Sequence, residues 1–105
     1  MKILDCTLRD GGYYTDWDFS DNLVNNYFNL IKYLPIDIIE VGYRGNKNKK
    51  SYLGEYYYLT KSKLKTIRKK LGKKKKISIM IDIKDWKTPK ELEKNLKECR
   101  NYVDI

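Results

Sequence analysis

Charged residues that could support catalysis stand at the ends of three apolar segments of this 105-residue sequence. Carboxylates suit hard divalent cations, and guanidinium groups suit anions. In parallel α/β folds the carboxyl ends of the strands share one rim, and ligands bind there. We therefore expect a site at this rim, drawn from the following residues: Arg9, Asp10, Glu40, Arg44, Asp82 and Asp85.

The elements that must position this site alternate between strand and helix. Strands are predicted at residues 2–8, 36–41 and 76–83, with the first half of a fourth at 102–105. Apolar residues at helical spacing predict helices between them, within residues 20–34, 64–71 and 89–99. This βαβαβαβ order predicts an α/β fold with a parallel sheet and right-handed crossovers.

Start and stop signals bound the predicted helices. Ser20 or Asp18 can cap the first helix, and Pro35 ends it. Gly72 is suited to follow the second helix. The sequence at 88–91 (TPKE) is a capping box with proline at the first helical position of the third helix.

Period-two alternation assigns the strand side chains to faces. Positions 5, 7 and 9 share one side of the first strand, and a loop is expected at residues 9–14. On the third strand, Ser78, Met80 and Asp82 lie opposite the isoleucines at 77, 79, 81 and 83. We expect the isoleucines to pack on helices, and the mixed face to point into a barrel interior or cleft, where polar groups need partners.

Two segments carry a specific motif: residues 3–12 (ILDCTLRDGG) and residues 38–42 (IIEVG). In both, the chain resembles the DRE-TIM metallolyases, a superfamily that includes hydroxymethylglutaryl-CoA lyase, isopropylmalate and homocitrate synthases, and 4-hydroxy-2-oxovalerate aldolase. The continuation at 12–19 (GYYTDWDF) resembles a branch of aldolase catalytic domain proteins. The resemblance is strong over residues 3–44 and consistent in layout to the last residue.

The resemblance implies a TIM barrel with Mg²⁺ or Mn²⁺ at the strand ends, of which residues 1–105 would form about the first three and a half βα units. By motif position, Asp10 would be a metal ligand. Arg9 would hold the enolate oxygen that develops when a carbon–carbon bond breaks or forms beside a ketone, and Glu40 would orient that arginine or the metal-bound water. Gly11 and Gly12 would let the backbone turn so that a substrate can approach. A fixed cation aimed at a developing enolate lowers the barrier electrostatically.

The sequence departs from the family pattern in its lack of histidine. The family supplies two further metal ligands from a His-x-His pair on a late strand, and one aldolase branch has a catalytic histidine where Tyr13 stands. A histidine base or triad made by this chain alone is excluded, and a single carboxylate holds a hard divalent ion poorly. We therefore predict that purified 1–105 does not cleave a 4-hydroxy-2-oxo acid with added Mn²⁺.

The predicted function is that of a metal-dependent aldolase or lyase-type domain, acting on a 2-oxo acid or acyl thioester through a metal-bound enolate and incomplete as this chain alone. The alternative is a non-catalytic basic α/β module that binds an anion, a nucleic acid or a partner chain. The net charge of +9 is typical of nucleic-acid binding. However, the run Lys73–Lys76 precedes the third strand and so lies at the end of the fold opposite Arg9. Self-association of two half-barrels is a third possibility.

Several residues keep two interpretations. Asp82 is more typical of a structural acid at a strand end than of a ligand. Arg44 and the lysines at 47, 49 and 50 attract a carboxylate or phosphate substrate, or belong to a solvated loop. The tyrosines at 56–58 suit helix packing or base stacking. Cys6 and Cys99 suit small buried positions.

Composition narrows the class of protein. A hydrophobic share of 41% supports a core, and ten tyrosines argue against disorder. Two isolated cysteines form neither a zinc pattern nor a disulfide framework. No apolar run approaches the roughly 18–20 residues of a membrane span, and the start of the sequence lacks the apolar core of a secretory leader. We expect a cytoplasmic protein that is the N-terminal part of a longer barrel, or one whose last strand a partner covers.

Overall fold

The computed structural model describes residues 1–46 and 52–105. Its strands form one parallel sheet in the order β1-β2-β3: β1 (Leu4–Asp5), β2 (Ile38–Tyr43) and β3 (Lys76–Met80). In this sheet Ile39 lies opposite Ile77, and Glu40 lies opposite Ser78. The α/β class and the parallel sheet are confirmed.

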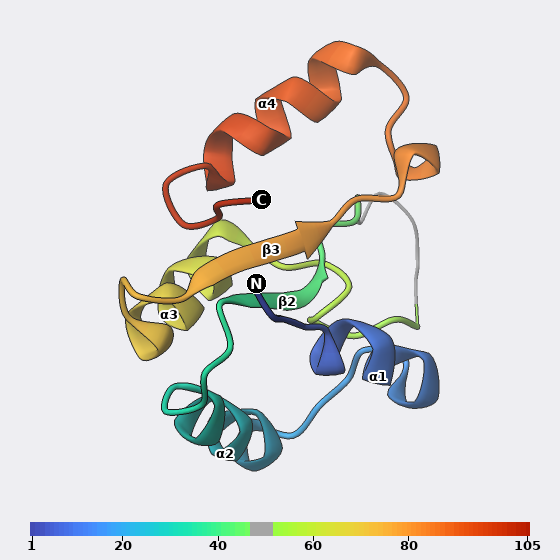
Figure 1. Ribbon diagram of the computed structural model, residues 1–105. Coiled ribbons are helices and arrows are strands. Elements are labelled where there is room, and N and C mark those ends of the chain that lie inside the picture. Colours follow the sequence, from blue (N-terminus) through green and yellow to red (C-terminus); the bar gives the residue numbers. More distant parts are fainter. Residues whose placement is uncertain (47–51) are drawn as a thin grey trace.

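Helices follow the strands: α1 (Thr7–Thr15), α2 (Asp21–Ile31), α3 (Lys61–Leu71), the short η1 (Ile83–Asp85) and α4 (Pro89–Cys99). Helices α2, α3 and α4 lie around the sheet, while α1 lies at the end toward which β3 points (Figure 1). Within the described residues, no helix is both long enough and apolar enough to cross a membrane.

The core fills the space between the sheet and its helices. Ile39, Val41 and Ile77 have no exposed surface. Against them pack side chains of α2 and α3 at helical spacing: Val24, Phe28, Ile31, Leu64, Ile67 and Leu71. Each fully buried aliphatic or aromatic side chain of this size contributes about 1.5–3 kcal/mol of transfer free energy. The apolar side chains of Ile39, Val41 and Ile77, which share one face, therefore fix which side of the sheet faces α2 and α3.

The caps of the predicted helices are confirmed, with Ser20 rather than Asp18 at the start of α2. The hydroxyl of Ser20 accepts a hydrogen bond from the backbone N–H of Leu23 at 3.2 Å. The hydroxyl of Thr88 accepts one from the N–H of Glu91 at 3.2 Å. A cap of this kind is worth about 1 kcal/mol.

The predicted strand at 2–8 and loop at 9–14 are wrong, because β1 ends at Asp5 and α1 begins at Thr7. The Asp5 carboxylate accepts the backbone N–H of Thr7 at 3.1 Å and supports the helix start. Glycine in a helix costs about 1 kcal/mol relative to alanine. Here Gly12 is needed, because a Cβ atom there would lie 2.0 Å from the indole of Trp17. Packing thus overrides local propensity, and Thr7 and Arg9 are not strand residues sharing a face with Asp5.

The third strand is shorter than predicted, and the fourth does not form. Strand β3 ends at Met80, and Asp82 then accepts the N–H of Lys84 at 3.1 Å to begin η1. The backbone N–H groups of Asp104 and Ile105 donate to the same carbonyl, that of Ile77, at 2.8 and 3.2 Å. Residues 102–105 therefore lie against β3 without a regular ladder, and the sheet of the described residues has three strands.

Candidate functional site

An ion pair joins α1 to β2 at the carboxyl end of the sheet. The guanidinium of Arg9 donates its Nε–H to Oε1 of Glu40 at 2.6 Å. The Glu40 side chain is only 8% exposed. Its other oxygen, Oε2, accepts a hydrogen bond from the hydroxyl of Ser78 on β3 at 3.3 Å. Glu40 is thereby held from two directions and in turn fixes the orientation of Arg9.

The ion pair uses only some of the N–H groups of Arg9, as far as the described residues show. The hydrogen bond to Glu40 raises the pKa of the Arg9 guanidinium above its ordinary value. A guanidinium has five N–H donors, and the contacts of Arg9 with Glu40 and Asp10 use its Nε and Nη1 groups. The remaining donors suit an anionic oxygen.

Asp10 completes the group and contacts both neighbours. One of its oxygens pairs with Arg9, and the other accepts the S–H of Cys6 at 3.3 Å. This hydrogen bond raises the pKa of the Cys6 thiol. Cys6 is half-buried rather than buried as we expected, because its thiol is directed to this carboxylate. The structure brings Arg9, Asp10 and Glu40 together, and their catalytic and metal-binding roles stay predictions.

The described part of the chain does not by itself fit a metal ion. It contains no group of three or more histidine, cysteine, aspartate or glutamate side chains that could hold one. Mg²⁺ requires near-octahedral oxygen coordination, whereas Asp10 is one carboxylate already shared between Arg9 and Cys6. Further ligands from outside these residues would be required.

An aromatic cluster borders the ion pair. The Trp17 indole donates its Nε1–H to the backbone carbonyl of Arg9 at 2.9 Å. The hydroxyls of Tyr13 and Tyr43 lie 3.2 Å apart, and the Tyr43 ring stacks on Tyr57 with centroids 4.7 Å apart. Burial and the hydrogen bond with Tyr13 raise the pKa of Tyr43 to about 12. Tyr43 therefore stays protonated at neutral pH and does not act as a base.

Sequence reasoning missed Trp17 and Tyr43 as neighbours of the ion pair. The run of aromatic residues from Tyr13 to Phe19 is visible in the sequence. It does not show that the chain reverses at Asp16 and Trp17, whose φ angles are 54° and 58°. That reversal directs Trp17 back onto α1.

Gly11 and Gly12 do not turn the backbone toward a substrate. Both lie inside α1, where Gly12 makes room for Trp17 and the nearest atoms to a Cβ at Gly11 would be those of Phe19, 3.7 Å away. This expectation is wrong because the segment is helical.

Arg44 is neither a substrate-attracting group nor part of a solvated loop. It is 6% exposed and donates to Asn95 Oδ1 at 2.5 Å, the Leu59 carbonyl at 2.7 Å and Glu98 Oε2 at 3.0 Å. These contacts tie the end of β2 to α4. The lysines at 47, 49 and 50 lie outside the described residues.

The other residues with two interpretations are also placed. Asp82 has the structural role that we favoured, as the residue that begins η1. Tyr56 is 2% exposed and packs edge-on against Phe19, so it cannot stack a base. Cys99 is buried as predicted, and burial raises the pKa of its thiol.

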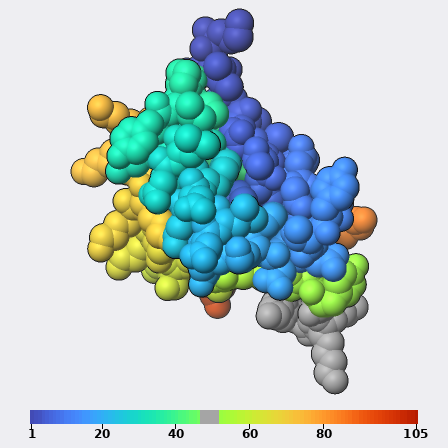
Figure 2. All heavy atoms as spheres, turned by 90° about the horizontal axis from the view of Figure 1, so that it is seen from below, coloured from blue at the N-terminus to red at the C-terminus, as the bar shows by residue number. Residues whose placement is uncertain are grey.

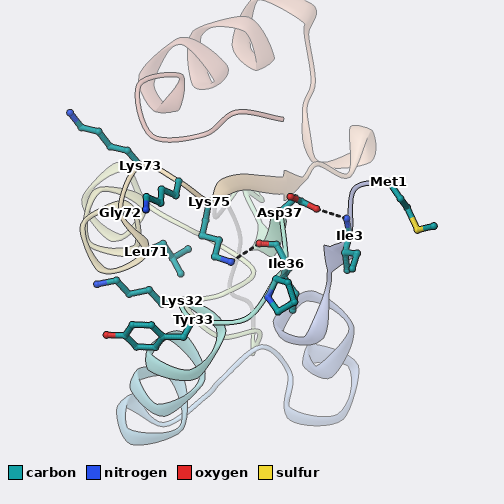
Figure 3. A pocket seen from close by; sticks show the side chains of 12 residues that line it. Met1, Ile3, Lys32, Tyr33, Ile36, Asp37, Leu71, Gly72, Lys73 and Lys75 are labelled. Atoms are coloured by element: carbon teal, nitrogen blue, oxygen red, sulfur yellow. Dashed lines mark hydrogen bonds between the residues drawn. The ribbon is translucent and has the colours of Figure 1, made fainter.

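A basic hollow of about 810 Å³ lies at the opposite end of the sheet. It is bounded by the first residues, the ends of α2 and α3, and lysines that include Lys32, Lys73 and Lys75 (Figure 3). The ammonium of Lys75 donates to the Ile36 carbonyl at 2.7 Å, and Asp37 accepts the N–H of Ile3 at 2.8 Å. In a view from below, the N-terminal residues project from the body beside this region (Figure 2). The lysine-rich surface and the Arg9 site are therefore separate, as the order of elements predicts.

Comparison with solved structures relates the chain to one crystal structure over almost its whole length. That structure is "the N-terminal domain of a putative aldolase from Bacteroides vulgatus", with 48% sequence identity and a TM-score of 0.86. The chain has an aldolase-like fold. The match covers 99% of this chain and 33% of the other, so the chain spans about a third of the length of that crystallised N-terminal domain. No family model matches the sequence, and no curated protein does.

Proposed function

We propose that this chain is the N-terminal part of a barrel aldolase or lyase of the DRE-TIM type, acting on a 2-oxo acid or acyl thioester. The reaction class is the making or breaking of a carbon–carbon bond beside a carbonyl, through an enolate. Asp10 would supply one ligand to a divalent metal, and the other ligands would come from the rest of the barrel.

The observation that carries this proposal is the fixed guanidinium of Arg9. It is held by the buried Glu40 at 2.6 Å, and its remaining N–H donors suit the oxygen on which enolate charge develops. Such a donor acts because it is already in place when the charge appears, and losing one typically costs about 10²–10³ in kcat. Glu40 is the positioning residue, since it touches Arg9 and Ser78.

The exposed side of the sheet supports completion by further barrel strands. Leu4 is 50% exposed and Met80 is 37% exposed. Leu4 pairs with Ile38, one residue away from the buried pair of Ile39 and Ile77, so it belongs to the face turned from the helices. The structural neighbour is about three times as long as this chain. Additional strands would cover these apolar side chains.

The proposal is tested by completing the barrel. Residues 1–105 are joined to the remaining two thirds of the crystallised Bacteroides vulgatus domain and assayed with Mn²⁺ on a panel of 4-hydroxy-2-oxo acids and 3-hydroxyacyl thioesters. We expect cleavage by the joined protein and none by 1–105 alone. Cleavage by 1–105 alone would contradict the division of the site between two parts, and no cleavage by the joined protein would contradict the reaction class.

A second candidate function, anion or nucleic-acid binding, is favoured by the basic hollow. Lys32, Lys73 and Lys74 line it, and a polyanion bound there would show strong salt dependence. The carboxyl ends of α2 and α3 also border the hollow, and the dipoles of these helices favour cations rather than anions there. The lysines thus have a structural reason to be there, and we rank this function second.

A further inference from the structure

A strained turn follows the helix that carries Arg9. Asp16 and Trp17 have φ angles of 54° and 58°. In this left-handed region the Cβ atom of an ordinary residue lies too close to the following carbonyl oxygen. Strain of this kind persists only where the surrounding structure holds it, and it gathers at functional sites. The contacts of the turn therefore show what the strain maintains.

Backbone hydrogen bonds hold the turn from two sides. Toward α1, the N–H of Trp17 donates to the Gly12 carbonyl at 3.1 Å. From the segment that begins at residue 52, the N–H of Gly54 donates to the Asp16 carbonyl at 2.6 Å, and that of Tyr56 donates to the Trp17 carbonyl at 3.1 Å. A Cβ atom at Gly54 would lie 2.5 Å from the Trp17 carbonyl oxygen, so this approach requires glycine. The backbone of Trp17 is therefore fixed independently of its side chain.

This conformation directs the indole of Trp17 against α1. Its Nε1–H donates to the backbone carbonyl of Arg9 at 2.9 Å, and its ring occupies the space that a Cβ atom at Gly12 would need. Trp17 is 6% exposed, and a buried indole N–H usually finds a hydrogen-bond partner. Here the partner is the residue whose guanidinium forms the candidate site.

The same indole joins α1 to β2. Its ring meets that of Tyr13 on α1 edge-on, with centroids 4.8 Å apart, and that of Tyr43 on β2 edge-on, with centroids 5.5 Å apart. The contact between Arg9 and Glu40 at 2.6 Å spans the same two elements. Packing of the indole therefore sets how α1 lies against β2. A displacement of about 1 Å at such a site can cost about 10²-fold in rate.

The second tryptophan of the chain provides an internal comparison. The indole Nε1 of Trp86 is buried and has no hydrogen-bond partner among the described residues. Trp86 follows η1, whereas Trp17 follows α1. Loss of the N–H group should therefore matter at Trp17 and not at Trp86.

We propose that Trp17 is a positioning residue of the candidate site. Its indole N–H, held in place by the left-handed turn, fixes Arg9 in the orientation in which Glu40 binds the guanidinium. The placement of Arg9 does not depend on the reaction. The consequence for catalysis rests on the proposed function, in which Arg9 holds the enolate oxygen.

The first experiment measures the placement of Arg9 in the full 105-residue chain, without any reaction. Trp17 is replaced by benzothienylalanine, which keeps the shape of the ring but has sulfur in place of the N–H group; the same replacement at Trp86 is the control. NMR follows the Nε–H of Arg9 in protein with ¹⁵N-labelled arginine. We expect this proton to exchange with water about fivefold faster or more in the Trp17 protein, and at an unchanged rate in the Trp86 protein. Unchanged exchange in a folded Trp17 protein, or equal changes in the two proteins, would overturn the proposal.

The second experiment measures the consequence for the reaction in the completed barrel with Mn²⁺. Trp17→Phe keeps an aromatic ring and removes the N–H group, and Trp86→Phe is its control. We expect Trp17→Phe to lower kcat for the exchange of pyruvate methyl protons with D₂O about fivefold or more. KM should stay unchanged, because Trp17 contacts Arg9 rather than the substrate. A change in KM alone, or equal losses in the two variants, would overturn the proposal. An unmodified barrel without this exchange would contradict the proposed function instead, and the NMR experiment would still decide the placement of Arg9.

Discussion

Arg9 on α1 and Glu40 on β2 are 31 residues apart in sequence, and their side chains meet at 2.6 Å. The contact depends on the helical conformation of residues 7–15, since it places Arg9 in the first turn of α1, within reach of Glu40 in β2. A rigid element, rather than a loop, therefore positions the guanidinium.

Removing the Glu40 carboxylate should destabilise the fold. In Glu40→Ala, Arg9 and Ser78 lose their shared partner, and we expect the free energy of unfolding to fall by about 1–3 kcal/mol. Urea denaturation followed by circular dichroism measures this change. The control is Glu93→Ala, whose side chain is 66% exposed and pairs with Lys97 within α4; its effect should stay below about 0.5 kcal/mol. Equal losses in the two variants would contradict a buried role for Glu40.

The two adjacent glycines of α1 should respond oppositely to alanine. A Cβ at Gly12 would lie 2.0 Å from the Trp17 indole, so Gly12→Ala should destabilise by about 1–3 kcal/mol through overpacking. A Cβ at Gly11 meets no atom closer than 3.7 Å, so Gly11→Ala should stabilise the helix by about 0.5–1 kcal/mol. Thermal unfolding of both variants checks the pair. A stable Gly12→Ala protein would mean that Trp17 does not pack on α1.

The thiol of Cys6 should report on Asp10. The hydrogen bond and the charge of Asp10 raise the pKa of Cys6, so Asp10→Asn should lower that pKa and increase the thiolate fraction. We expect faster alkylation of Cys6 by iodoacetamide at pH 8, measured by mass spectrometry. The buried Cys99 is the internal reference, and its rate should not change. An unchanged Cys6 rate would show that the two side chains are not in contact.

Asp104 should make stability fall on acidification. Burial raises the pKa of the Asp104 carboxyl. The backbone N–H of Ile77 at 2.9 Å and the guanidinium of Arg68 lower it by more, so its pKa lies below the ordinary value of 3.8. A pKa that is lower in the folded state stabilises the protein above the unfolded-state pKa, and this contribution is lost as pH falls through the folded-state pKa. Asp104→Asn should therefore lower stability at pH 7 and flatten its decline below about pH 4. Urea denaturation at pH 7 and pH 3 checks this, and parallel pH profiles for the two proteins would contradict it.

The lysines of the basic hollow should not affect the aldolase site. Lys73→Gln with Lys74→Gln changes charges at the amino ends of the strands, away from Arg9 and Glu40. We expect the completed barrel to retain its activity within about twofold, because salt screens the charge of these lysines at the opposite end of the sheet from Arg9. Fluorescence anisotropy with single-stranded RNA tests the second candidate function in the same variant. RNA binding that disappears together with the lysines, in a barrel without aldolase activity, would favour the basic module.

Much of the fold could be predicted because the buried face of a helix requires apolar residues at regular spacing in the sequence. The apolar spacing of α2 and α3, and the caps at Ser20 and Thr88, are local signals that the structure confirms. Helix α1 could not be predicted, because its glycines resemble a loop and are tolerated only through the packing of Trp17 on Gly12.

The candidate site was predictable in part, because the carboxyl ends of parallel strands lie at the same edge of the sheet. Arg9 follows β1 and Glu40 lies within the neighbouring parallel strand β2, so their proximity followed from topology. Arg44 stands in an equivalent position, yet its partners Asn95 and Glu98 are more than 50 residues away and set its role. The packing of Trp17 on α1 depends on the left-handed turn at Asp16, which apolar periodicity does not reveal.

The most direct test follows the methyl protons of pyruvate. A completed barrel with Mn²⁺ in D₂O should exchange them for deuterium, as seen by proton NMR, because exchange requires only the enolate. We predict that Arg9→Ala and Arg9→Lys slow this exchange by about 10²-fold or more, while Arg100→Ala, which removes an exposed arginine at the end of α4, leaves it unchanged. Exchange at the same rate in the Arg9 variants and in the Arg100 variant would contradict the assignment of Arg9 to the enolate oxygen.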